Sequence, residues 1–134
     1  MTGTVDYLSD GERVIAVENG HELLGQVTGV RPPPSPPLTT KPSILTKHYQ
    51  TGCAIGAISG CFLATHRSDK LLAVLSGLLM YEIAAENAAA KEYVRGPGSF
   101  VPAFLDELYA IRQTALKGDD SWLDGRGKIR EVKV

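Results

Sequence analysis

The chain has 134 residues and a formal net charge of −1, a length that fits one domain with a hydrophobic core. This near-neutral charge gives no electrostatic reason to expect nucleic acid or an anionic membrane as a partner. The two cysteines are too few for a disulfide scaffold and lack the spacing of a metal site, so we expect a reduced, cytoplasmic setting.

Two short runs rich in β-branched and aromatic residues open the chain, at Val5–Leu8 and Val14–Val17. Ser9–Glu12 between them is typical of a tight turn, so the pair predicts a β-hairpin. Asn19-Gly20-His21 then ends the second strand, and we interpret His21 as part of a structural turn rather than as an acid or base. Met1–Asp6 has neither the basic start nor the apolar core of a signal peptide, so none is expected.

A proline-rich segment, Val30–Gln50, interrupts the chain and holds six of its eight prolines and no acidic residue. Such a composition favours extended structure that buries little surface. Beyond it, Cys53–Thr65 is apolar on every side and predicts a helix buried all round, with Cys61 in the core. Lys70 to about Tyr93 predicts a second buried helix, too short in its apolar stretch to be a membrane anchor.

The second helix has Ser68 or Asp69 as its expected cap. Ser99 is the expected cap of a third helix that stops at Gly118, and we read Asp119–Val134 as a polar tail, mostly loop. A hairpin followed by three helices predicts an α/β layer fold. An all-round apolar helix needs more neighbours than this chain supplies, so we expect the fold to be incomplete.

Joining Gly29 to Thr51 produces Gly29-Thr51-Gly52-Cys53, a glycine-rich turn that opens a helix. Backbone N–H groups at a helix start bind phosphate without a cationic side chain. The helix dipole also lowers the pKa of a thiol at the first turn, where Cys53 would accept the proton of an attacking alcohol or position that alcohol. The alternative is a plain helix cap followed by a small buried residue.

Five segments occur in the order and spacing of one enzyme family. They are Val5–Gly11, Asn19–Gly29, Thr51–Cys53, Gly96–Phe100 and Phe104–Asp106. Together they resemble hydroxyethylthiazole kinase, a ribokinase-like family. The C-terminal sequence is most similar to the kinase part of fungal bifunctional thiamine enzymes. The related hydroxymethylpyrimidine phosphate kinase also has a Gly-Thr-Gly-Cys loop, but it matches the other segments less well.

The resemblance implies ATP-dependent phosphorylation of the alcohol 4-methyl-5-(2-hydroxyethyl)thiazole, with Mg²⁺, in a homotrimer. It implies that Thr2 contacts ATP, that Gly29 contacts the thiazole and that Cys53 occupies the place of a catalytic base. Thr51 and Gly52 would bind the phosphate. We identify no metal ligands, because the family's acidic residues near the metal belong to a first half that this chain does not show.

The resemblance divides the chain into kinase segments at 1–29 and 51–118, an insertion at 30–50 and a tail at 119–134. We interpret the insertion as an unspliced intron translated in frame, because valine codons begin with GT, a glutamine codon is CAG, and deletion restores the motif. The alternative is a docking peptide, since Arg31–Pro37 matches a pattern that SH3 domains read. We expect the chain as it stands to have little kinase activity.

Overall fold

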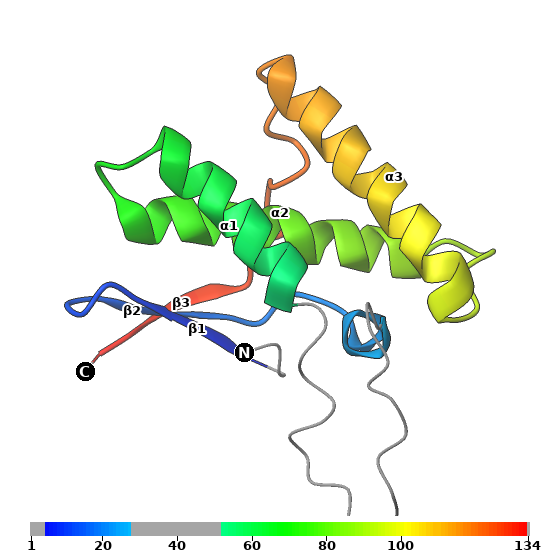
Figure 1. The fold of residues 1–134 in the computed structure, drawn as a ribbon, viewed down its shortest axis with the longest axis horizontal. Helices are drawn as coiled ribbons and strands as arrows, with labels where there is room; N and C mark the ends of the chain where they lie inside the picture. Colours follow the sequence, from blue (N-terminus) through cyan, green and yellow to red (C-terminus); the bar gives the residue numbers. More distant parts are fainter. Residues whose placement is uncertain (1–4, 28–51, 134) are drawn as a thin grey trace, which may run out of the picture.

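The protein is described by a computed structural model that covers residues 5–27 and 52–133. Its elements, in chain order, are strands β1 (Asp6–Ser9) and β2 (Val14–Val17), the 3-10 helix η1 (Glu22–Gln26), helices α1 (Gly52–Thr65), α2 (Lys70–Ala89) and α3 (Pro97–Leu116), and strand β3 (Ile129–Val132). In Figure 1, α1 and α3 both lie against α2, and the sheet lies along the same central helix. The predicted α/β arrangement of a hairpin followed by three helices is confirmed.

The sheet has three antiparallel strands in the order β1-β2-β3. Asp6 pairs with Val17 across the hairpin, and Val17 also pairs with Ile129 of β3. The prediction that the tail is mostly loop holds for residues 119–128, but it missed strand β3 at Ile129–Val132. A four-residue strand carries little signal of its own, and its pairing is fixed by β2, which lies more than a hundred residues earlier in the chain.

Helix α2 is the centre of the hydrophobic core. Ile83 is fully buried, and Tyr81 meets Phe104 of α3 edge to face at a ring-centroid distance of 4.9 Å. Phe104 also stacks on Phe100 at 5.7 Å. By length and hydropathy α2 could cross a membrane, but 67% of its apolar window is buried inside the protein, as expected of a core helix.

The predicted helix ends agree with the structure only in part. Asp69 caps α2 by accepting a hydrogen bond from the Leu72 N–H, as predicted, although α2 ends at Ala89 rather than near Tyr93. The predicted Ser99 cap of α3 was wrong. The helix begins at Pro97, which needs no N–H at the first position, and the Ser99 hydroxyl instead accepts a hydrogen bond from the backbone of Arg95.

Helix α1 packs tightly on α2 along one side only. A Cβ on Gly77 of α2 would lie 3.1 Å from Phe62 and 3.3 Å from Ile58, so this glycine allows the two helices to approach closely. On the other side of α1, Cys61 is exposed and Gly60 has open space beside it. The predictions of an α1 buried all round and of Cys61 in the core were therefore wrong for this chain.

A carboxyl group lies buried between α2 and the hairpin. Glu82 is 2% exposed, and Asp6 of β1 is 7% exposed. Burial raises the pKa of Glu82 to about 9, and the hydrogen bond and charge of Asp6 act in the same direction. Glu82 is therefore protonated at neutral pH. Gly20 lies beside the Glu82 side chain, and its φ of +108° is a backbone conformation that favours glycine.

The Glu82→Gln variant should gain stability relative to the wild type as the pH rises. An unfolded glutamate ionises near pH 4.5 and the folded Glu82 near pH 9, so the wild-type free energy of unfolding falls across this range. The largest slope is about 1.4 kcal/mol per pH unit. Urea unfolding between pH 5 and 9 measures the difference, with Glu131→Gln at an exposed position as the control. Parallel pH profiles of Glu82→Gln and the wild type would contradict the assignment.

Candidate functional site

The residues predicted to form the phosphate loop meet the described structure at the start of α1. The helix begins at Gly52, and Cys53 is its second residue. The other three predicted site residues, Thr2, Gly29 and Thr51, lie outside the described residues. The prediction that a helix begins at the Thr-Gly-Cys sequence is confirmed, whereas the roles of these residues stay predictions.

The predicted anion site depends on the backbone groups at the start of α1. The first backbone N–H groups of a helix have no partner within it, and they lie at the positive end of the helix dipole. The first turn of α1 contains no acidic residue that would compete for these groups. A phosphate placed at Gly52 would therefore meet N–H donors and no fixed negative charge from this turn.

The segment that leads from the sheet toward Gly29 is held by short-range and long-range contacts. The His21 ring accepts a hydrogen bond from the Leu23 N–H at 3.2 Å and so caps η1, which agrees with its predicted structural role. Leu24 is buried in the main core. After η1 the backbone is extended at Val27, with φ −79° and ψ 110°. The core thus fixes where the chain departs toward the predicted loop.

Glu86 of α2 holds the turn that precedes η1. One of its carboxylate oxygens accepts hydrogen bonds from the Asn19 amide at 3.2 Å and from the Gly20 N–H at 3.0 Å. Asn19 is itself 8% exposed, so its polar side chain needs these partners. Because Gly20 has a positive φ, the turn also depends on glycine at this position.

Arg126 and Lys128 of the tail form hydrogen bonds with the same network. The Asn19 amide donates to the Arg126 carbonyl at 2.9 Å, and the Asn19 carbonyl accepts from the Lys128 N–H at 2.7 Å. The Arg126 guanidinium donates to Asn87 at 2.6 Å and lies 3.5 Å from Glu86. The strand β3 therefore enters the sheet from a point clamped to α2. Sequence reasoning missed Glu86 and the tail, since no local pattern links residues so distant in the chain.

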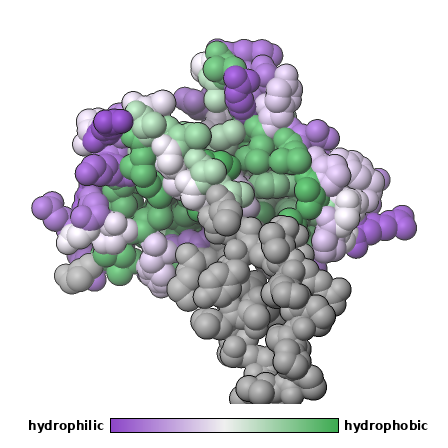
Figure 2. Space-filling model, viewed as in Figure 1, coloured by the Kyte–Doolittle hydropathy of each residue, from purple (hydrophilic) through white to green (hydrophobic). Residues whose placement is uncertain are grey.

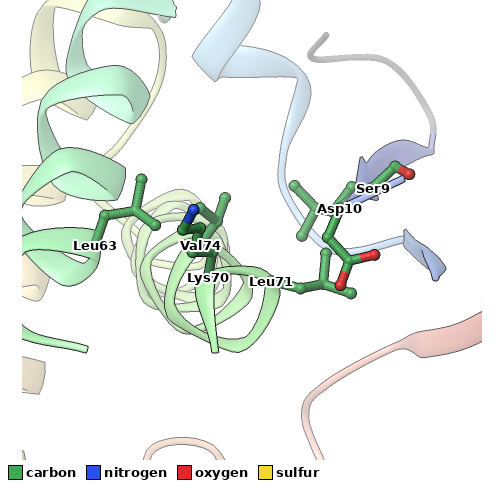
Figure 3. A pocket seen from close by; sticks show the side chains of 7 residues that line it. Ser9, Asp10, Leu63, Lys70, Leu71 and Val74 are labelled. Carbon is green, nitrogen blue, oxygen red and sulfur yellow. The ribbon is translucent and has the colours of Figure 1, made fainter. Parts of the chain in front are cut away.

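A separate pocket of about 250 Å³ lies at the other end of α2. Figure 3 shows it between β1 and the facing ends of α1 and α2, with Leu63, Leu71 and Val74 on its apolar wall. The Arg13 guanidinium forms ion pairs with Asp10, which lines the pocket, at 2.7 Å and with Asp69 at 3.0 Å. Hydrogen bonds from the Arg13 backbone and side chain lower the pKa of Asp10 to about 2.

No group of three histidine, cysteine or acidic side chains that could hold a metal occurs in the part of the chain that the structure describes.

Comparison with known proteins identifies the family. A model of the hydroxyethylthiazole kinase family matches residues 35–114, which is more than half of the chain. This chain belongs to the hydroxyethylthiazole kinase family. The match decides between this family and the hydroxymethylpyrimidine phosphate kinase alternative, and it confirms the resemblance seen in the sequence.

Individual relatives of this kinase family extend the match over the chain. A hydroxyethylthiazole kinase from Pyrococcus furiosus is 41% identical over 83% of this chain and 32% of its own length. A probable thiamine biosynthetic bifunctional enzyme from Schizosaccharomyces pombe is 31% identical over 99% of this chain and 23% of its own length. The solved structure of the Pyrococcus horikoshii hydroxyethylthiazole kinase is 37% identical, with a TM-score of 0.70 over 99% of this chain and 40% of that one.

The chain therefore has part of the hydroxyethylthiazole kinase fold. It spans between about a quarter and two fifths of the length of these relatives. The expectation of an incomplete ribokinase-like layer fold is confirmed to this extent, and the likeness to the fungal bifunctional enzyme is confirmed as well.

Replacing Glu86 with alanine should destabilise the protein and release the tail. The change leaves the buried Asn19 amide and the Gly20 N–H short of an acceptor, at a cost of about 1–3 kcal/mol. Hydrogen exchange should show faster exchange in β3 as well as at Gly20, because the tail is clamped to the same side chain. Glu92→Ala, at an exposed position outside the network, is the control and should change neither value. Equal loss of stability in both variants would contradict the role of Glu86.

Proposed function

We propose that this chain carries the phosphate loop and the surrounding C-terminal part of a kinase that phosphorylates 4-methyl-5-(2-hydroxyethyl)thiazole with ATP. The observation that carries the proposal is the start of α1 at Gly52, within a Thr-Gly-Cys sequence and without acidic side chains in its first turn. In this proposal the amides of Thr51 and Gly52 bind the transferring phosphoryl group, Thr2 contacts ATP and Gly29 contacts the thiazole.

The proposed reaction moves one phosphoryl group and one proton. The substrate alcohol oxygen forms a bond to the γ-phosphorus while the bond from that phosphorus to the bridging oxygen breaks, and ADP leaves. Cys53 accepts the alcohol proton in this proposal, a role that a thiol in the first turn of a helix can fill. Mg²⁺ enters only as the ion that accompanies ATP, and no described residue is assigned to it. A homotrimeric assembly and a cytoplasmic location complete the proposal, in keeping with the family resemblance.

The Cys53→Ser variant tests the assigned base. It should be made in a version that joins Gly29 directly to Thr51 and that carries the rest of the kinase domain. We expect kcat for the thiazole alcohol to fall about 10²–10⁴-fold, the contribution usual for a general base. Cys61→Ser, eight residues further along the same helix, is the matched control and should keep its kcat. Similar losses in both variants would remove Cys53 from the mechanism, and a preference for hydroxymethylpyrimidine phosphate would overturn the substrate.

The insertion Val30–Gln50 lies outside the described residues, and we propose that it is a retained intron. The 134-residue chain should then show little or no ATP-dependent phosphorylation of the thiazole alcohol, because the insertion separates Gly29 from Thr51. A radiolabelled ATP assay on the purified chain measures this. Transcripts from the same cells should mostly join codon 29 to codon 51. Normal turnover by the chain would refute the prediction of impaired activity, and transcripts that all retain codons 30–50 would refute the intron.

A further inference from the structure

Helix α3 carries a stripe of large exposed side chains along one face. The stripe consists of Leu105, Tyr109, Arg112 and Leu116, and its two leucines and its tyrosine are between 58% and 66% exposed. Steps of four, three and four residues keep these side chains on the same side of a helix. In Figure 2, green and purple surface alternate along α3, which runs from the top to the right of the view. Large apolar side chains aligned in this way are typical of a helix that packs against another protein element.

The opposite side of α3 is fixed in the core. Phe100, Phe104 and Ile111 are buried there, and α3 packs on α2 and η1. The Glu107 carboxylate also forms an ion pair at 2.7 Å with Lys91, just after the end of α2. The helix therefore cannot rotate to bring its stripe inward, and the four side chains of the stripe stay directed away from the core.

The stripe is complementary to itself. Leu105 and Leu116 are equally far along the helix from the midpoint between Tyr109 and Arg112. When two copies of α3 pack in antiparallel directions about a two-fold axis at this midpoint, the two different leucines face each other across the contact. Each tyrosine then faces an arginine. A surface for an unrelated partner has no reason to show this symmetry, whereas a contact between two copies requires it.

The groups that face each other in this arrangement attract one another. The Arg112 guanidinium of one copy lies over the Tyr109 ring of the other, as in a cation–π contact, and the symmetry produces this contact twice. The Asp106 carboxylate is also exposed, and along the axis it lies within one helical turn of the second copy's arginine. The facing leucines remove apolar surface from water. Shape, hydrophobicity and charge therefore favour the same register.

We propose that the outer face of α3 is a two-fold contact between two copies of this chain, in which the helices pack antiparallel and each Tyr109 meets the Arg112 of the other copy. Such a contact uses the same patch on both copies, whereas a trimer uses two different patches of each subunit. The α3 contact is therefore separate from the trimer proposed above. It also involves no residue of the proposed phosphate loop, so its test is independent of the proposed chemistry.

Sedimentation velocity of the 134-residue chain measures the contact, and we expect a dimer whose population rises with protein concentration. Tyr109→Lys removes the ring and places a second cation opposite Arg112, so it should raise the dimer Kd at least tenfold. Tyr93→Lys is the matched control, because Tyr93 is 61% exposed but lies outside the stripe, and it should leave the Kd unchanged. A monomer at every concentration, or equal weakening by the two variants, would overturn the proposal.

A charge exchange guards against misfolding of the variant. When Tyr109→Lys is combined with Arg112→Asp, a lysine faces an aspartate across the two-fold axis, and the dimer should return. Its return shows that the single variant failed at the contact and not in folding. A double variant that stays monomeric would overturn the pairing of these two positions.

Disulfide trapping tests the antiparallel register. The variants Leu105→Cys and Leu116→Cys are made in a chain whose native cysteines, Cys53 and Cys61, are replaced by serine. Mixing the two variants under mild oxidation should give a cross-linked heterodimer, because these positions face each other across the axis. Each variant alone should cross-link at least tenfold more slowly. Cross-linking of each variant mainly with itself would overturn the register, and so would the absence of any cross-link in the mixture.

Discussion

The carboxylate of Glu86 joins three parts of the protein that are far apart in sequence. It accepts hydrogen bonds from Asn19 and Gly20 at the turn after β2, and it lies 3.5 Å from the basic side chains of Arg126 and Lys128 in the tail. Because Asn19 is buried away from water, its amide group must find its hydrogen-bond partners within this network. The turn before η1 and the return of the chain to β3 are therefore both tied to this one side chain of α2.

The same dependence explains what the sequence could predict. The hairpin, the Asp69 cap and the start of a helix at Gly52 follow from turn, capping and glycine signals within a few residues, and the structure has all three. Strand β3 exists only because β2 offers an edge and because Asn19 fixes Lys128 beside it. Interactions between residues more than a hundred positions apart leave no periodic trace, so the tail was predicted as loop.

The sequence predicted the helix start at Gly52 but not the hydrogen-bond network of Asn19 and Glu86 at the turn before η1. A glycine-rich turn before an apolar run is visible to sequence reasoning, whereas Asn19 and Glu86 look like an ordinary turn residue and an ordinary helix residue. The exposure of α1 was also missed for a physical reason. The hydropathy of a helix predicts how much of its surface is buried, but not which neighbours bury it. In the described chain α1 is packed on one side, where it meets Gly77 of α2.

Folding and phosphate binding should respond differently to the insertion between Gly29 and Thr51. A loop of about twenty residues adds little closure entropy, since that cost grows only with the logarithm of loop length. On the near side of this segment, η1 packs on α2 and α3. An anion site is less tolerant, because a misplacement of about 1 Å between reacting groups can cost about a hundredfold in rate. On the proposal that residues 30–50 are an insertion, a chain can keep this fold while losing the geometry of the two amides proposed to bind phosphate.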